Sequence, residues 1–375
     1  IKDLVISDLT SSYRFRLNEE SGQFARDDRR RIKGRVDNPV WVSENSRKWQ
    51  MVFETRSNEF LCAGYDAISH EIRAFCRDSL GTYNMQTRRR RSQQFRNNCP
   101  VALTLGTNFM NPKTGDIYAY EVRYDKDWKG PVTMARLDTA HLVWYPVSEQ
   151  NLDMQMHHHC EWLDTLNGEF YIFGGFGDRR YNGSFTRFNL ERREWSACPE
   201  PAGDRIWPRY FSAMGYNPEE NALYIYGGMG NESGEQIVGR QYFHDLHRVQ
   251  LPDFTIEKKW SLDSPTERNT VAARNMVLDG EEHFYVLCYP ESETESELQL
   301  TRFAISDGSR EELGNTIPIF SDKITTNANL FLDETLGKLI AIVEESRDDI
   351  SSSVKCYSID FPPKPPLKEK AAGKG

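Results

Sequence analysis

The sequence lacks several features that would assign it to common protein classes. No apolar run approaches the roughly 18 residues that a membrane-spanning segment needs. The cysteines are odd in number, seven, and no two have the spacing Cys-x-x-Cys, so a disulfide framework is not expected. No glycine-rich phosphate loop opens a helix, no nucleophile elbow is present, and no helical pattern is long enough for a dinucleotide-binding fold. The sequence therefore offers no residue set typical of the common nucleotide-dependent enzymes or hydrolases.

Basic residues are also fewer than acidic residues. The chain has 47 Lys and Arg against 56 Asp and Glu, which gives a net charge of -9. A general nucleic-acid binder needs a basic footprint, so we expect no nucleic-acid partner. Two local basic runs, Arg29–Arg31 and Arg88–Arg91, are interpreted as solvated loops between strands, with a patch for an anionic partner as the alternative.

What the sequence does contain is a repeat. A turn followed by an apolar-aromatic strand occurs at 111–122, 166–175 and 217–228. The first apolar strand residues are Ile117, Phe170 and Leu223, 53 residues apart in both steps. The same pattern extends to Phe60, Phe284 and Leu339, with steps of 57, 61 and 55 residues. A nearly constant period of this length predicts a repeat architecture.

Each copy has similar neighbours, which predict four strands per repeat. An apolar strand precedes the turn, and an alternating strand follows a variable loop. A further strand often carries Trp. The segments in question are 210–216 and 329–332 before the turn, 185–190, 243–249 and 300–305 after the loop, and those around Trp195 and Trp260. Four antiparallel strands form one blade of a β-propeller, an arrangement that leaves only short exposed edges.

Two copies carry a family signature. Gly174-Gly175 with Phe188 and Trp195, and Gly227-Gly228 with Trp260, resemble the kelch-repeat family and the central domain of galactose oxidase. The other four copies have lost the glycine pair. The resemblance implies an all-β, six-bladed kelch-type propeller, with seven blades as the alternative. We expect the glycine pair to permit a tight, close-packed exit from the strand.

The ends of the chain determine how such a ring would close. The last repeat lacks a fourth strand, so we expect the N-terminal segment to supply it, through 4–7 or 13–17. This divides the chain into a closing or entry segment at 1–42, a propeller at 43–361 and a linker tail rich in Pro and Lys at 362–375. Residues 1–7 and 15–41 also resemble fragments of laminin-G or concanavalin-like lectin domains, which would make them remnants of an upstream domain.

The sharpest cluster of functional side chains is His157-His158-His159. On a strand, His157 and His159 would share one face and could begin a metal site, but no third ligand is evident. The triplet aligns with 210–212 of the next repeat, at the start of an inner strand. We interpret the histidines as structural or as lining a ligand pocket, and we expect no metal or cofactor.

A second candidate surface mixes arginine with aromatic residues. It comprises Arg205, Trp207, Arg209 and Tyr210, side chains that suit contacts with carbohydrate or protein. The alternative is a loop that packs on the neighbouring blade.

These observations favour a non-catalytic binding or scaffold module for a glycan or protein partner. We expect a monomer that forms one part of a larger envelope or surface protein in an extracytoplasmic compartment. The kelch resemblance implies an alternative, a carbohydrate-active enzyme. That enzyme would be a sialic-acid mutarotase using Arg209 and Glu161 at the axis, or a copper-radical sugar oxidase.

Overall fold

The computed structural model describes residues 4–15, 24–29, 31–35, 44–122, 130–152, 155–262, 269–348 and 351–365. These residues form an almost entirely β structure, as the sequence predicts. Their helical content is one α-helical turn, α1 (Glu44–Arg47), and one 3-10 turn, Gln236–Val238. None of the helices in this part of the chain has the length and apolar character needed to cross a membrane.

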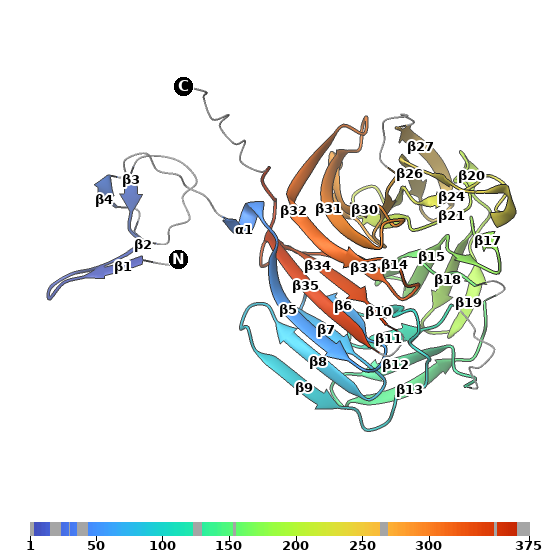
Figure 1. The fold of residues 1–375 in the computed structure, drawn as a ribbon, viewed down its shortest axis with the longest axis horizontal. Coiled ribbons are helices and arrows are strands. Elements are labelled where there is room, and N and C mark those ends of the chain that lie inside the picture. The colour runs from blue at the N-terminus through green and yellow to red at the C-terminus, as the bar shows by residue number, and fades with distance from the viewer. Residues whose placement is uncertain are drawn as a thin grey trace.

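Six antiparallel sheets, each with a core of four strands, account for most of the chain (Figure 1). The first sheet contains β6 (Cys62–Asp66), β7 (Glu71–Phe75), β8 (Ser79–Asn84) and β9 (Arg90–Gln94). The second contains β10 (Asn108–Met110), β11 (Ile117–Tyr120), β12 (Met134–Asp138) and β13 (Val143–Ser148). The third contains β14 (Cys160–Asp164), β15 (Glu169–Phe173), β18 (Phe185–Asn189) and β19 (Glu194–Ala197).

The other three sheets follow the same order. The fourth contains β22 (Ala213–Asn217), β23 (Ala222–Tyr226), β26 (Asp245–Gln250) and β27 (Thr255–Ser261), with β20 (Ala202–Gly203) added alongside β27. In the fifth, β28 (Val271–Ala272) and β29 (Val277–Asp279) both pair with β30 (His283–Tyr289), followed by β31 (Glu295–Ala304) and β32 (Arg310–Phe320). The sixth contains β33 (Asn327–Asp333), β34 (Lys338–Glu345), β35 (Ser352–Asp360) and β5 (Gln50–Ser57).

Two small sheets are formed by loop segments that connect strands of the larger sheets. One pairs β16 (Phe176–Gly177) with β17 (Arg180–Tyr181). The other contains β21 (Arg209–Tyr210), β24 (Met229–Gly230) and β25 (Gln241–Tyr242).

The repeat predicted from the sequence corresponds to these sheets in five cases out of six. Ile117, Phe170, Leu223, Phe284 and Leu339 all lie in the second strand of a sheet and are at most 1% exposed. The prediction for Phe60 is wrong. Phe60 precedes the first strand of its sheet and is 39% exposed, whereas the equivalent buried residue is Ile72 in β7. The true first step is therefore 45 residues (117 − 72), shorter than any step in the predicted register.

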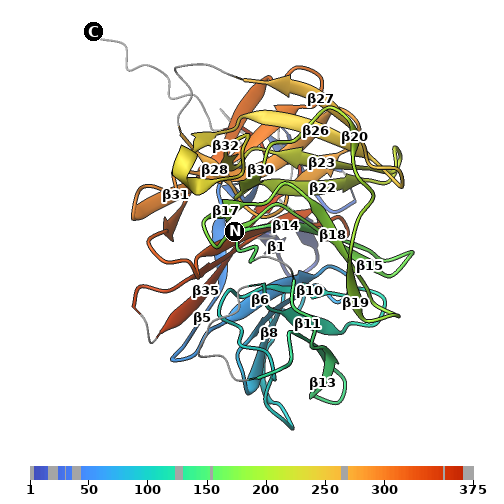
Figure 2. The ribbon, with the colours of Figure 1, turned by 90° about the vertical axis from the view of Figure 1, so that its right-hand side faces the viewer.

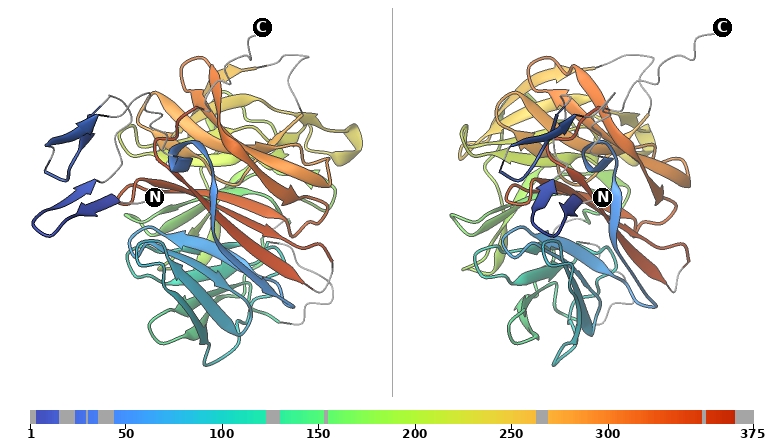
Figure 3. Two further views of the ribbon diagram at one scale, coloured as in Figure 1. Left: turned by 60° about the vertical axis from the view of Figure 1, so that its left-hand side comes forward. Right: turned by 90° about the vertical axis from the view of Figure 1, so that its left-hand side faces the viewer.

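The predicted closing strand is also wrong. The fourth strand of the sixth sheet is β5, which pairs with β35 from Ser57 opposite Ser352 to Gln50 opposite Ser358. The segment predicted to close the ring instead forms two hairpins, which Figures 1 and 3 show standing apart from the six sheets. These hairpins pair β1 (Leu4–Ser7) with β2 (Ser12–Phe15), and β3 (Phe24–Arg26) with β4 (Ile32–Arg35). Residues 16–17 of the predicted strand lie outside the described residues.

The hydrophobic core is divided into six clusters, one between each pair of neighbouring sheets. Successive clusters join the first sheet to the second, the second to the third, and so on to the sixth. A final cluster, which includes Phe53, Tyr65 and Ile342, joins the sixth sheet back to the first. Figure 2 shows the sheets from the side, stacked face to face. Each sheet therefore buries both of its faces against sheets that precede and follow it.

A polar motif that the sequence analysis missed recurs in the second, third, fourth and fifth sheets. In four sheets a Tyr of the second strand lies opposite an Arg of the third, as in Tyr171 and Arg187. In three of them that Arg pairs with a carboxylate near the first turn, with distances of 2.7 Å for Asp116, 3.1 Å for Glu169 and 3.5 Å for Glu220. The motif holds the second and third strands to the turn that precedes them.

The glycine pairs have the structural role expected of them. Gly228 has a φ of 100°. A Cβ atom there would lie 2.7 Å from the Tyr210 carbonyl oxygen, closer than real Cβ contacts allow. At Gly174 the corresponding distance, to the carbonyl oxygen of Arg209, is 2.6 Å. Backbone conformation and close approach of the next segment both require glycine at these positions.

Substitution of Gly228 tests this packing against a matched control. Gly239 has nearly the same φ, 103°, but a Cβ atom added there would meet no described atom within 4 Å. We expect Gly239→Ala to cost about 1–2 kcal/mol for backbone conformation alone. Gly228→Ala should cost that amount and a further ~1–3 kcal/mol from overpacking, as measured by urea denaturation. Equal losses for the two variants would contradict the close-approach explanation.

Truncation tests the role of β5. We expect removal of residues 1–43 to leave the thermal unfolding of the sheets unchanged within a few degrees, because within the described residues β1–β2 and β3–β4 form two-stranded sheets separate from the six larger ones. Removal of residues 1–57 also deletes β5, so it exposes the edge of β35 and the cluster around Phe53. That variant should lose cooperative unfolding in a calorimetric scan. Cooperative unfolding of the shorter chain would show that β5 is dispensable.

Candidate functional site

The histidine triplet lies in a turn, not in a strand. His158 has a φ of 54°, in the left-handed region, and β14 begins only at Cys160. The predicted alignment with 210–212 is confirmed, since Phe211 has a φ of 56° and its N–H donates to the His158 carbonyl oxygen at 2.9 Å. The alternation expected of a strand therefore does not apply, and the three rings go to different surroundings.

His157 and His158 belong to an aromatic cluster. The His158 ring stacks on Phe211 at 4.0 Å, and His157 packs edge-on against Phe176 and Tyr210 at 5.2 and 5.7 Å. Burial lowers the pKa of His158 well below its ordinary value, so the ring is neutral. Because His158 Nε2 donates to the Thr326 carbonyl oxygen at 2.9 Å, its Nδ1 accepts from His157 Nδ1 at 2.8 Å.

His159 points inward and joins a buried polar layer between the sheets. Its Nδ1 donates to the Met156 carbonyl oxygen at 2.7 Å, and its Nε2 lies 2.7 Å from the Tyr120 hydroxyl. That hydroxyl donates to Glu161 Oε2 at 2.6 Å. Arg274 continues the layer, with Nη1 3.8 Å from the same oxygen and Nη2 donating to Asn327 at 2.8 Å. Burial opposes the charged form of Glu161, but Arg274 and His159 outweigh it and lower the pKa of this carboxyl, which is therefore ionised.

Glu344 is a second buried carboxyl of this layer, and its hydrogen bonding differs from that of Glu161. Its Oε1 accepts from the Ala63 N–H at 2.5 Å, while its Oε2 has no hydrogen-bond partner within the described ranges. Burial raises the pKa of Glu344 to about 8, with Arg274 opposing the shift. The carboxyl is therefore protonated at neutral pH.

The second predicted surface separates into buried and exposed parts. Arg209 is only 1% exposed. Its guanidinium donates to both carboxylate oxygens of Asp245, at 2.6 and 3.1 Å, and to the carbonyl oxygens of Trp207 and Gly227, and it stacks over Phe243 at 4.0 Å. This bidentate, buried pair gives Arg209 a structural role in place of the predicted ligand-binding one.

Of the remaining members of that surface, Tyr210 contacts the histidines, whereas Arg205 and Trp207 lie apart from them. Tyr210 packs on His157, as described above. Arg205 is exposed, and Trp207 is partly exposed with an edge-on contact to Phe243 at 6.0 Å. Within the described ranges, no hydrogen bond or ring contact joins Arg205 or Trp207 to the histidine triplet.

A cavity of about 160 Å³ lies among the first strands of the sheets, and we call it the axial cavity. Its walls come from the first strands of the first, second, third and sixth sheets, with Phe170 of β15 and with Asn275 of the fifth sheet, which precedes β29. The parallel bridge between Met214 and Asn275 shows that the chain runs in the same direction at the start of the fourth and fifth sheets. The lining residues are Ala63, Gly64, Tyr65, Asn108, Phe109, Met110, Glu161, Trp162, Leu163, Phe170, Asn275, Asn329 and Phe331.

The lining has two levels, set by the alternation of strands. Residues two apart share a strand face and differ in height by about 6.6 Å. We call the polar lining residues Asn108, Glu161 and Asn329 the lower level, and the largely apolar residues two places later, Met110, Leu163 and Phe331, the upper level. By strand register, Asn329 and Phe331 lie one residue before the positions equivalent to Glu161 and Leu163. The sequence analysis named Glu161 at the axis but missed the two asparagines. The signal that could have found them is a polar residue two places before an apolar one near the start of a first strand.

The turns that follow the first strands of the six sheets are rich in carboxylates. These turns span 66–71, 111–116, 164–169, 217–222, 279–283 and 333–338, and contain two lysines. Their acidic residues are Asp66, Glu71, Asp116, Asp164, Glu169, Glu219, Glu220, Asp279, Glu281, Glu282, Asp333 and Glu334. We call them the inner turns. Arg88–Arg91 lie farther out, around the turn between β8 and β9, where Arg90 packs over Phe53 at 5.2 Å.

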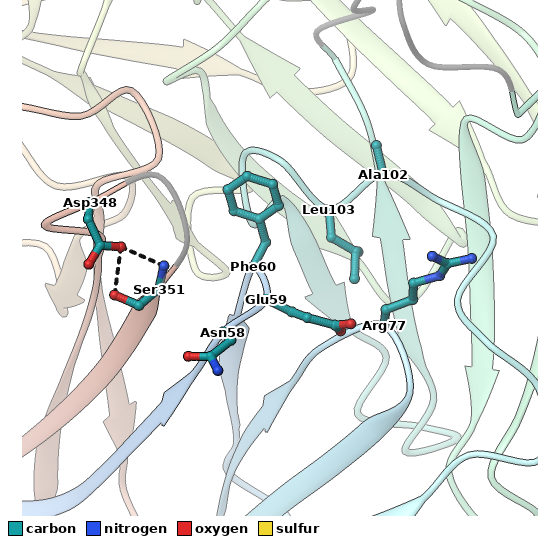
Figure 4. Close-up of a pocket in the computed structure, with 8 residues that line it drawn as sticks. All are labelled: Asn58, Glu59, Phe60, Arg77, Ala102, Leu103, Asp348 and Ser351. Carbon is teal, nitrogen blue, oxygen red and sulfur yellow. Dashed lines mark hydrogen bonds between the residues drawn. The ribbon is translucent and has the colours of Figure 1, made fainter.

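A second hollow, of about 270 Å³, lies between the sixth, first and second sheets (Figure 4). Figure 4 shows Phe60 and Leu103 on one part of its wall and Asp348, which accepts two hydrogen bonds from Ser351, on another. Nearby, Glu59, Cys76 and Asp78 form the one group of three potential metal ligands that the described residues bring within 4.8 Å of each other. The group contains no histidine, and the Cys76 thiol is already hydrogen-bonded to Asp78 and Ser79 at 3.3 and 3.1 Å. We therefore do not assign a metal site to it.

Comparison with known proteins gives no family assignment. No protein-family model matches this sequence, and no curated protein is significantly similar to it.

Stability as a function of pH tests the environment of Glu344. Its pKa is about 8 in the folded protein against an ordinary value of 4.5, so the folded state holds this proton more tightly. The resulting stabilisation is present below pH 4.5 and is lost as the pH rises through about 8. Stability should fall by about 1.4 kcal/mol per pH unit across that window from this group alone.

Glu344→Gln removes this proton while keeping an oxygen acceptor for Ala63. We expect the variant to lack that part of the pH dependence when urea denaturation is compared at pH 5 and pH 8. Glu311→Gln, at a partly exposed residue paired with Arg302, serves as the control. An identical pH profile for wild type and Glu344→Gln would refute the assignment.

Proposed function

We propose that the six sheets form a closed, six-bladed, kelch-like β-propeller that serves as a non-catalytic recognition module. The circuit of six core clusters, the strand order within each sheet and the two close-packed glycine pairs support this architecture. In this proposal the axial cavity receives one group of a glycan or protein partner.

The observation that carries the proposal is the side chain of Asn329. It lines the axial cavity, the residue is only 6% exposed, and its amide has no hydrogen-bond partner in the described part of the chain. Its amide is not among the fully enclosed polar atoms without a partner, so it is open to the cavity. A polar group in this position can hold water in the free protein and exchange that water for a hydrogen bond to a ligand. A few polar groups among apolar walls are typical of ligand sites.

A second candidate function is an enzyme acting on a sugar. The ionised Glu161, held by Tyr120, His159 and Arg274 at the floor of the cavity, could accept a proton from a substrate hydroxyl. In that case Arg274 would take the role that the sequence suggested for Arg209. We place this second because Arg274 does not line the axial cavity.

An extracytoplasmic location and membership of a larger surface protein remain part of the proposal. All seven cysteines are free thiols. Six of them are buried, which protects them from oxidation in such a compartment.

Binding screens on glycan and peptide arrays test the function. We expect a ligand whose affinity falls at least about tenfold in Asn329→Ala and in Met110→Phe, which fills the upper level of the cavity. Arg205→Ala and Trp207→Ala should bind normally, since neither residue lines the cavity. Thermal melting would confirm that all four variants fold.

Two results would reject the proposal. One is a ligand lost through Arg205 or Trp207 but not through Asn329. The other is turnover of a sugar by the purified protein, abolished in Glu161→Gln, which would establish the enzyme.

A further inference from the structure

The polar level of the axial cavity presents mainly hydrogen-bond acceptors. Glu161 uses Oε2 for its contacts with Tyr120, His159 and Arg274, and its Oε1 has no partner among the described residues. Asn108 donates from its amide nitrogen to two carbonyl oxygens, at 3.1 and 2.8 Å, which leaves its side-chain oxygen without a partner there. With the amide of Asn329, these groups are suited to a ligand that donates several hydrogen bonds.

The charge around this level is negative. No Lys, Arg or His is among the residues that line the cavity. Arg274 offsets Glu161 in part, from the far side of the carboxylate, at 3.8 Å. An anionic ligand, such as an acidic sugar, would therefore meet a carboxylate and no cation within the cavity.

The inner turns carry further negative charge, and four of them, 66–71, 111–116, 164–169 and 333–338, follow strands that line the cavity. Four arginines of the second and third strands, Arg73, Arg136, Arg187 and Arg248, pair with carboxylates of the inner turns. When these and the two lysines are counted against the twelve carboxylates, a net charge of −6 remains (12 − 4 − 2), with His taken as neutral. Such a net charge raises the local concentration of cations and steers them toward the cavity.

The apolar upper level and the volume of the axial cavity limit the shape of the ligand group that it can hold. Met110, Leu163 and Phe331 offer an apolar wall above the polar floor. At about 160 Å³, the cavity is smaller than the 300–1,000 Å³ typical of sites for whole small molecules. A ligand that matches has an aliphatic stem, a donor-rich head and a positive charge. Lysine has this form, a flexible four-carbon stem with three donors on its ammonium group.

We propose that the axial cavity binds the side chain of a lysine presented by a protein partner, with the ammonium group on Glu161, Asn108 and Asn329 and the stem along Met110, Leu163 and Phe331. The inference rests on the proposed function, since it specifies the ligand of the same cavity. It commits to a protein partner where the sequence left glycan and protein open.

Calorimetric titration with small probes tests it directly. Nα-acetyl-lysine methylamide should bind saturably and more weakly as salt increases. The norleucine analogue, which keeps the stem without the ammonium, and the Nε-acetylated lysine analogue should bind at least about tenfold more weakly. Methyl glucoside serves as the neutral sugar probe.

Matched variants locate the site. Glu161→Gln should weaken lysine binding at least about tenfold, whereas Glu344→Gln, which alters another buried carboxyl that does not line the cavity, should leave it unchanged. Asn329→Ala gives a second variant in case Glu161→Gln fails to fold, which a thermal melt would reveal.

The outcomes separate this inference from the proposed function. If methyl glucoside or the norleucine analogue binds as well as the lysine probe and Asn329→Ala abolishes it, the cavity is a binding site and the lysine assignment is wrong. If the lysine probe shows no saturable binding, the assignment is likewise overturned. If the lysine probe binds and Glu161→Gln and Asn329→Ala both bind normally, the axial cavity itself is not the site.

Discussion

The pairing of β5 with β35 is the contact on which the rest of this structure depends. It joins residues 50–57 to residues 352–358 and completes the sixth sheet. With that sheet complete, the cluster around Phe53, Tyr65 and Ile342 can form, and every sheet then buries both faces. Without it, the first and sixth sheets would each expose an apolar face, and one strand edge would be left unpaired.

The same arrangement brings the first strands together and creates a polar layer with two distinct parts. His159, Tyr120, Glu161 and Arg274 form a connected network on one side, in which Arg274 Nε has no partner among the described residues. Asn329 and the free oxygens of Asn108 and Glu161 face a cavity with groups still unmet. Arg209 and Asp245 show the opposite case, a buried charged pair whose donors all have partners and whose role is to hold one loop against a sheet. Burial alone therefore does not distinguish a ligand site from a structural ion pair, whereas a polar group that faces a cavity is one that a ligand can reach.

The sequence predicted the repeated elements well because they depend on local pattern. Period, strand alternation and the glycine pairs located the second strands of five sheets and the Trp-bearing strands of two. The first repeat was misplaced at Phe60 because the run 60–65 leads into β6, and a buried first strand has the same apolar-aromatic composition as a second strand. The closing strand was assigned to 4–7 or 13–17 because pattern does not say which distant segment pairs with β35. For the site, Glu161 and the repeat alignment of the histidines were accessible. The burial of Arg209 was not, since its partner Asp245 lies 36 residues away in another strand.

The separation of β5 from β35 also bears on how the chain acquires its structure. Nearly 300 residues lie between the two strands (352 − 57 = 295). Loop-closure entropy rises only slowly with length, so this distance costs the finished protein little. During synthesis, however, β5 leaves the ribosome nearly 300 residues before its partner β35. The apolar residues and the open edge of β5 therefore stay unpaired until β35 has been made, and transiently exposed apolar surface and strand edges of this kind favour aggregation.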